Sequence, residues 1–179
     1  MNIKPIETKN WQEELFSTLK KEGINQISFV PDAGHSKIIN MAINDPEIKS
    51  ISLTTEEEGV ALSCGAWLGG HKSVLLMQSS GVGNCINMFS ILKSCNFPFL
   101  TFVTMRGEFE EFNSWQVPMG SITKPSLELM GFRVSRIDSS DQVLPVTKNA
   151  LVDVFEKNQK VAILLSQKFI GKKLSLIHI

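Results

Sequence analysis

The sequence predicts an α/β protein, a three-layer α/β/α domain built on a mostly parallel, doubly wound sheet of about six strands. Two observations support this prediction. Six short apolar runs recur along the chain, and most are continuously apolar rather than alternating, as in strands that are covered on both faces. Segments with helical periodicity separate these runs, and such strand–helix alternation builds a parallel sheet with helices on both sides.

The elements can be placed along the chain in order. The strands are expected at 26–30, 51–53, 73–77, 99–104, 132–137 and 161–165. The helices are expected at 8–22, 35–44, 57–70, 82–95, 123–130 and 140–157. Thr8 and Asp141 are suitable N-terminal caps, and Gly23 and Gly131 are suitable helix ends. The pattern gives one domain over residues 1–170, whereas residues 171–179 continue none of it and form a tail of unclear role.

Composition narrows the class of protein. Hydrophobic residues make up 42% of the 179 residues and charged residues 20%, which is typical of a globular domain. Eighteen basic side chains balance eighteen acidic ones, so no net field favours nucleic acid or an anionic membrane. The three cysteines have no C-x-x-C spacing, and the first residues have no apolar signal core. We therefore expect a cytoplasmic protein without a membrane or nucleic-acid partner.

Polar residues gather in four loops that leave the carboxyl ends of predicted strands. These loops are 31–35, 54–56, 78–84 and 105–108. In open α/β sheets, ligands bind outside the carboxyl ends of the strands. The convergence of these loops therefore predicts a site at this edge of the sheet.

An acidic triplet, Glu56 to Glu58, precedes a stretch with very few charges. From 59 to 105 the only basic or charged side chains are His71, Lys72 and Lys93. Acidic residues in the first turn complement the helix dipole, by about 0.3–1 kcal/mol each, and this interpretation suits Glu57 and Glu58. For Glu56 two interpretations remain open: a solvated carboxylate or one held in a dry site for chemistry.

The glycine-containing segment 79–84 does not match a known nucleotide-binding motif. Ile86 occupies the position where a dinucleotide fingerprint requires its third glycine. The segment is either a tight strand-to-helix turn or a place where the backbone approaches a ligand closely. The helices predicted on both sides of it, 57–70 and 82–95, are apolar on nearly every face. Such helices must be buried all round, so we expect an oligomer with an interface beside the Glu56 loop.

Other candidate residues carry weaker signals. His35 follows a strand, and its near-neutral pKa suits proton transfer, although a capping or surface role explains it equally well. Cys85 has no evident basic partner, so a small buried side chain is the better interpretation. The segment around Phe109, Phe112 and Trp115 is aromatic-rich and suits a lid or an interface.

Several motifs together resemble one enzyme family. They are Glu56-x-x-Gly59 with Gly65 nine residues after Glu56, and the Ser79-Ser80-Gly81-Val82-Gly83-Asn84 turn, in which Ser80 follows Glu56 by twenty-four residues. This pattern, from about residue 8 to residue 170, resembles the pyrimidine-binding domain of thiamine-diphosphate enzymes. Val30-Pro31-Asp32 and the segment from Arg106 to Thr123 resemble the branch of the sulfopyruvate and phosphonopyruvate decarboxylases.

The resemblance implies a cofactor and roles for particular residues. In the family a glutamate, here Glu56, hydrogen-bonds N1′ of the thiamine diphosphate aminopyrimidine and promotes loss of the C2 proton. The residues expected to bind the cofactor are Pro31, Glu56, Ser79, Ser80, Gly81 and Gly83. His35 and Gln116 are expected to join Glu56 in catalysis, and Asp32 and Arg106 are expected to bind substrate.

The resemblance also implies a partner. The family holds Mg²⁺ and the diphosphate through a Gly-Asp-Gly motif, which this sequence lacks, so the chain itself is expected to hold no metal. We expect the alpha subunit of a two-component 2-oxo acid decarboxylase, a carboxy-lyase that is inactive without its beta subunit and acts on a small acidic 2-oxo acid. The alternatives are a carboligase, a decarboxylase of another 2-oxo acid, and a non-catalytic paralogue that stabilises a partner.

Overall fold

The computed structural model describes residues 10–171, so both the predicted Thr8 cap and the tail after residue 171 lie outside the described residues. Six strands form one sheet in the order β2-β1-β3-β4-β6-β5. Every neighbouring pair is parallel, which confirms the predicted fold class and makes the sheet parallel throughout. The strands are β1 Ile24–Phe29, β2 Lys49–Ser52, β3 Lys72–Gln78, β4 Phe99–Thr104, β5 Arg133–Ile137 and β6 Lys160–Leu165.

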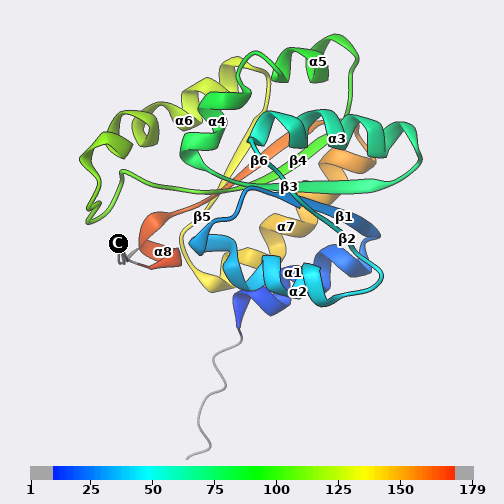
Figure 1. The fold of residues 1–179 in the computed structure, drawn as a ribbon, viewed down its shortest axis with the longest axis horizontal. Helices are drawn as coiled ribbons and strands as arrows, with labels where there is room; N and C mark the ends of the chain where they lie inside the picture. Colours follow the sequence, from blue (N-terminus) through cyan, green and yellow to red (C-terminus); the bar gives the residue numbers. More distant parts are fainter. Residues whose placement is uncertain (1–9, 172–179) are drawn as a thin grey trace, which may run out of the picture.

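Helices cover both faces of the sheet (Figure 1). One face carries α1 Trp11–Lys21, α2 Ser36–Asn44 and α7 Ser140–Phe155. The other carries α3 Glu56–Leu68, α4 Ser79–Cys85, α5 Phe89–Ser94 and α6 Val117–Leu129. Short helical turns complete the chain at η1 Ala33–His35, η2 Ser114–Gln116 and α8 Gln167–Ile170. Among the described residues, no helix has both the length and the apolar character that crossing a membrane requires.

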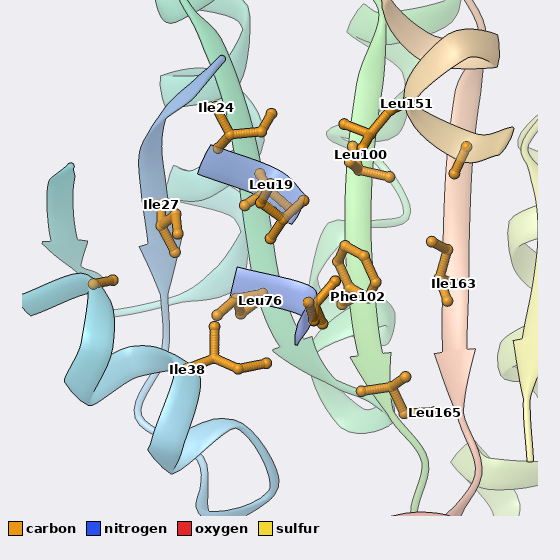
Figure 2. Close-up of a cluster of buried hydrophobic side chains, with 14 of the residues drawn as sticks. Leu19, Ile24, Ile27, Ile38, Leu76, Leu100, Phe102, Leu151, Ile163 and Leu165 are labelled. Carbon is orange, nitrogen blue, oxygen red and sulfur yellow. The ribbon is translucent and has the colours of Figure 1, made fainter. Parts of the chain in front are cut away.

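Each face of the sheet has its own hydrophobic core. In the first core, Leu76 and Phe102 on the strands meet Leu19 of α1, Ile38 of α2 and Leu151 of α7 (Figure 2). In the second, the rings of Phe89, Phe99 and Phe132 pack edge to face, with centroids 4.8–6.1 Å apart. Burying each large apolar side chain contributes roughly 1.5–3 kcal/mol, so the two cores hold the strand ends in fixed positions.

The region predicted as one helix over 82–95 contains two. Helix α4 begins directly after β3, at Ser79, and ends at Cys85; α5 begins at Phe89 after a turn. Cys85 and Phe89 are both fully buried, whereas Asn87 in the turn is exposed. The break therefore keeps both apolar side chains against the sheet, and the segment is not a helix buried on all sides.

The predicted helix ends are partly right. Gly23 and Gly131 follow α1 and α6 with φ of 85° and 84°, the left-handed conformation that glycine adopts most easily. Asn10 caps α1 through its side chain, which accepts a hydrogen bond from the Gln12 amide at 3.2 Å. The Asp141 prediction was wrong, because α7 begins at Ser140 and places Asp141 inside its first turn.

Candidate active site

Three of the four predicted loops meet in a cavity at the carboxyl ends of β1 and β3. Its volume is about 140 Å³, and its walls are Val30, Pro31, Asp32, Glu56, Gln78 and Ser80. The chain leaves β1 to form β2 on one side and later returns to form β3 on the other. This is a topological switch point, the place where open α/β sheets bind ligands.

Glu56 is the first residue of α3 and lies in the wall of this cavity. Only 7% of its surface is exposed. Its Oε2 accepts a hydrogen bond from Asn84 Nδ2 at 2.9 Å. Within residues 10–171 no donor is recorded for its Oε1. The carboxylate is thus oriented by one oxygen while the other is available to a ligand.

Two glycines allow Glu56 to take this position. A Cβ on Gly81 would lie 2.4 Å from the Glu56 Cδ, so only glycine lets α4 pass this close to the carboxylate. A Cβ on Gly59 would lie 2.4 Å from Leu75 Cδ1, so glycine also lets α3 pack tightly on β3. The spacing between Glu56 and the glycine turn therefore reflects a direct contact between two helix N-termini.

The other two acids of the triplet lie outside the site. Glu57 and Glu58 are exposed, and Glu58 Oε2 accepts a hydrogen bond from the Thr54 amide at 2.9 Å. This contact is typical of an acid in the first turn of a helix. The structure therefore separates Glu56 from its two neighbours by burial.

Asp32 borders both the first cavity and a second one. The second cavity is lined by Asp32, Ala33, Gly34, Thr104, Arg106, Gln167, Ile170 and Gly171. Asp32 Oδ2 accepts hydrogen bonds from the Gly34 amide at 3.1 Å and from Thr104 Oγ1 at 2.8 Å. The structure thus brings the two predicted substrate-binding residues, Asp32 and Arg106, into one cavity wall.

Arg106 is not a free cation. Its guanidinium forms a two-pronged ion pair with the buried carboxylate of Glu111, with Nε to Oε2 at 2.7 Å and Nη2 bonded to Oε1. The Arg106 guanidinium lowers the pKa of Glu111 to about 2. Gln167 Nε2 donates to the same carboxylate at 2.9 Å. Binding of an anion by Arg106 must therefore compete with Glu111.

His35 lines neither cavity. Its ring is fully buried, with Nε2 at 3.3 Å from the Met77 carbonyl oxygen and 3.2 Å from that of Phe102. Burial lowers the pKa of His35 below its ordinary value, so the neutral ring donates from Nε2. The ring is thus held by the backbone at the ends of β3 and β4, and the catalytic role of His35 stays a prediction.

The remaining predicted residues divide into two groups. Pro31 and Ser80 line the first cavity. Ser79 is buried, and its hydroxyl accepts a hydrogen bond from the Arg106 amide at 3.1 Å, whereas Gly83 is exposed on α4 and approaches Met119. Gln116 is buried beside the first cavity and bonds to Gln78 at 3.2 Å.

Sequence reasoning did not identify Asn84, Gln78 and Glu111 as functional residues. Asn84 was visible as the last residue of the glycine turn, and its position four residues after Ser80 places it one helical turn further along α4. Gln78 is the first residue of the predicted loop 78–84 but had no role assigned, and Glu111 gave no signal, because the partners of both depend on the folded structure. Within residues 10–171, no cluster of three or more His, Cys, Asp or Glu side chains suits a metal ion.

Comparison with known proteins gives relatives that are named as decarboxylases or as a decarboxylase subunit. No family model matches the chain. It is 35% identical to the sulfopyruvate decarboxylase subunit alpha of Methanococcus maripaludis, over 87% of this chain and 94% of the relative. It is 33% identical to the sulfopyruvate decarboxylase of Methanosarcina acetivorans, over 89% of this chain but only 41% of that protein. It is also 33% identical to the phosphonopyruvate decarboxylase of Streptomyces viridochromogenes, over 73% of this chain and 34% of that protein.

A solved structure agrees in fold. The 2-oxoglutarate:ferredoxin oxidoreductase from Magnetococcus marinus superposes with a TM-score of 0.69 over 89% of this chain and 29% of that one, at 12% identity. At this identity the likeness concerns the fold alone. The sequence relatives decide the family, because the first of them is matched over nearly its whole length. The chain therefore belongs to the family of the sulfopyruvate decarboxylase alpha subunits.

Proposed function

We propose that this chain is the alpha subunit of a thiamine-diphosphate-dependent 2-oxo acid decarboxylase in which Glu56 activates the cofactor. One observation carries the proposal: a buried carboxylate at a topological switch point has one oxygen held by Asn84 and the other without a partner among residues 10–171. The names of the relatives support the reaction class. The free cysteines Cys64, Cys85 and Cys95 suit a cytoplasmic protein.

The residues of the first cavity fit the aminopyrimidine of the cofactor. Glu56 Oε1 has no donor in the described part of the chain, and a protonated ring nitrogen, N1′, would supply one. A hydrogen bond to an ionised group of this kind contributes roughly 1.5–3 kcal/mol, and more where water is excluded. Pro31 and Ser80 would flank the ring, while Gly81 keeps space beside the carboxylate.

Bound thiamine diphosphate supplies the electron sink for loss of CO₂ from a 2-oxo acid. The task of the chain is to orient the cofactor and to hold a proton at N1′. Glu56 performs this task as an ionised carboxylate that Asn84 keeps in one rotamer. Glu56 itself is only 7% exposed, so a hydrogen bond to its carboxylate is screened less than one at the surface.

The diphosphate and its Mg²⁺ belong, in this proposal, to a beta subunit with the Gly-Asp-Gly domain. The sequence has no Gly-Asp-Gly, and the described residues offer no metal cluster. A relative named "subunit alpha" supports a partner, and a longer relative, of which this chain matches 41%, has room for both parts in one protein. The active species is then a hetero-oligomer.

The second cavity is the proposed place for the substrate, a small acidic 2-oxo acid of the sulfopyruvate or phosphonopyruvate type. It adjoins the first cavity through Asp32. Among residues 10–171, the Arg106 charge in this wall is matched by Glu111. We infer that the anionic group of the substrate either shares Arg106 with Glu111 or meets a cation of the beta subunit.

Co-expression tests the proposal. The chain is purified with the subunit that carries the Gly-Asp-Gly domain, and CO₂ release is measured from sulfopyruvate, phosphonopyruvate and pyruvate with and without thiamine diphosphate. We expect cofactor-dependent release from at least one acidic 2-oxo acid. Binding of the cofactor without release from any of them would instead support a carboligase or a decarboxylase of another 2-oxo acid, and the absence of both would support the non-catalytic paralogue.

A further inference from the structure

The side-chain amide of Gln78 connects the two cavities. Its Nε2 donates to Asp32 Oδ1 at 3.0 Å. Its Oε1 accepts from Ser80 Oγ at 3.0 Å and from Gln116 Nε2 at 3.2 Å. We propose that Gln78 is a positioning residue that sets the amide orientation of Gln116, so that Gln116 presents its carbonyl oxygen to the bound ligands; this inference rests on the proposed function.

The orientation of Gln78 follows from the partners of Asp32. An ionised carboxylate only accepts hydrogen bonds, so the group that faces Asp32 Oδ1 must be a donor. Of the two ends of the Gln78 amide, only the nitrogen meets this condition. The other Asp32 oxygen already accepts from Gly34 and Thr104, which fixes the carboxylate itself. Asp32 therefore determines which end of Gln78 faces each neighbour.

The orientation of Gln116 follows from that of Gln78. The Gln78 oxygen is directed away from Asp32 and accepts hydrogen bonds from both Ser80 and Gln116. These two donors use its two lone pairs. Gln116 must therefore direct its nitrogen to Gln78. Its own Oε1 is buried and finds no hydrogen-bond partner within residues 10–171, and Gln116 as a whole is only 4% exposed.

An unpaired buried acceptor destabilises the folded protein, so this oxygen points to a missing donor. The donor must carry an N–H or O–H, such as the amino group of an aminopyrimidine or a hydroxyl at the reacting carbon. Without Gln78, the Gln116 amide could rotate and present its NH₂ group instead, which would repel such a donor. Gln78 thus determines whether Gln116 offers the site a hydrogen-bond acceptor or a donor.

A double-mutant cycle in the reconstituted complex tests this role. Gln78→Met removes both hydrogen-bonding ends at similar size, and Gln116→Met removes the group it acts on. We expect Gln78→Met to lower kcat by about 10²-fold, the usual effect of misplacing a reacting group. Its KM and the Kd for thiamine diphosphate should change much less. The double variant should be no slower than Gln116→Met within about two-fold, because the two residues act as one unit.

Gln26→Met is the matched control. Gln26 is a buried glutamine on β1, and its Nε2 meets only the Leu62 carbonyl at 3.4 Å. It should leave kcat unchanged. If Gln78→Met behaves like Gln26→Met, or if its effect multiplies with that of Gln116→Met, the inference is wrong. Gln78→Asn, which is one methylene too short to reach both partners, serves as a second variant should Gln78→Met fail to fold.

A readout independent of activity separates this inference from the proposed function. Hydrogen exchange of the Gln116 side-chain NH₂ is followed by NMR in the full chain labelled with ¹⁵N-glutamine. In the wild type this group donates to Gln78 and should be protected, whereas in Gln78→Met it should exchange faster. Equal exchange in both proteins would overturn the inference. An inactive wild-type complex with this protection intact would instead contradict the proposed function alone.

Discussion

A hydrogen bond from Asn84 orients the carboxylate of Glu56, an acid at the N-terminus of a helix, although the two residues are distant in the sequence. The two residues are 28 apart in the sequence, yet Asn84 Nδ2 lies 2.9 Å from Glu56 Oε2. Motif spacing, read through the family resemblance, selects Glu56 from its triplet. It does not reveal the residue that orients Glu56, since that depends on where α3 and α4 meet.

Removing this contact should weaken the proposed activity without removing it. Asn84→Ala keeps the Glu56 carboxylate but lets it change rotamer. We therefore expect kcat of the complex to fall by about 10-fold or more, because a misplaced reacting group slows catalysis. Asn87→Ala, three residues further along and exposed, is the control and should have no effect. Equal rates for both variants would mean that Asn84 does not position Glu56.

The Arg106–Glu111 pair makes stability depend on pH. The folded pKa of Glu111, about 2, lies below its ordinary value of 4.5. A depressed carboxyl pKa contributes stability that is full above about pH 4.5 and is lost as the pH falls toward 2. The contribution is on the order of 3 kcal/mol, because one pKa unit corresponds to about 1.4 kcal/mol.

We therefore expect the free energy of unfolding of the full chain to fall between pH 4.5 and 2, and to fall less steeply in Glu111→Gln. The measurement is urea unfolding at a series of pH values. Glu128→Gln, which removes an exposed acid paired only loosely with Lys124 at 3.8 Å, is the control and should keep the wild-type slope. An identical slope in Glu111→Gln would contradict the buried ion pair.

For helices and strands, the sequence predicts those elements whose position depends on a local pattern of apolar and polar residues. Apolar runs placed all six strands. The central strands β4 and β6 are buried along almost their whole length and need no polar positions, whereas the edge strands β2 and β5 carry exposed residues. The start of α6 was missed: the helix begins at Val117 and not at 123. Pro118 and Gly120 make this segment resemble a loop, but a Cβ on Gly120 would lie 2.1 Å from the Arg106 carbonyl oxygen. That contact, which links α6 to the end of β4, is not visible in a linear sequence.

Replacing each of two helical glycines by alanine should therefore change the free energy of unfolding in opposite directions. Gly120→Ala places a methyl group against backbone and should lower the free energy of unfolding by about 1–3 kcal/mol. A Cβ on Gly65 in α3 would meet nothing within 4 Å, so Gly65→Ala should raise it by about 0.5–1 kcal/mol. Thermal unfolding of the full chain compares them. A Gly120→Ala protein as stable as wild type would show that α6 does not pack on Arg106.

For the whole molecule, the central proposal is that the chain supplies one half of a site that a beta subunit completes. The sheet edge, the cavities and Glu56 are present in one chain, whereas the described residues offer no metal cluster. The fold could be predicted from strand–helix alternation, and the loop positions predict the sheet edge at which the candidate cavities lie. The Gln78 and Arg106 networks could not, since Gln78 and Asp32 are 46 residues apart and meet only in the folded sheet.

The half-site predicts weak cofactor binding by the chain alone. Isothermal titration calorimetry with thiamine diphosphate and Mg²⁺ should detect binding to the complex. The isolated chain should show no binding, or binding at least about 10²-fold weaker. Each ten-fold loss of affinity corresponds to about 1.4 kcal/mol of missing contacts. Binding of equal strength to both would show that no beta subunit is needed for the diphosphate.

The role of Glu56 is tested most directly by the rate at which the C2 proton of bound thiamine diphosphate exchanges with deuterium in the complex. Glu56→Gln keeps the size of the side chain but removes its charge, so the exchange should slow by about 10²-fold or more. Glu57→Gln, an exposed neighbour in the same helical turn, should exchange at the wild-type rate. Slow exchange in Glu57→Gln together with wild-type exchange in Glu56→Gln would contradict the assignment of Glu56 as the cofactor-activating residue.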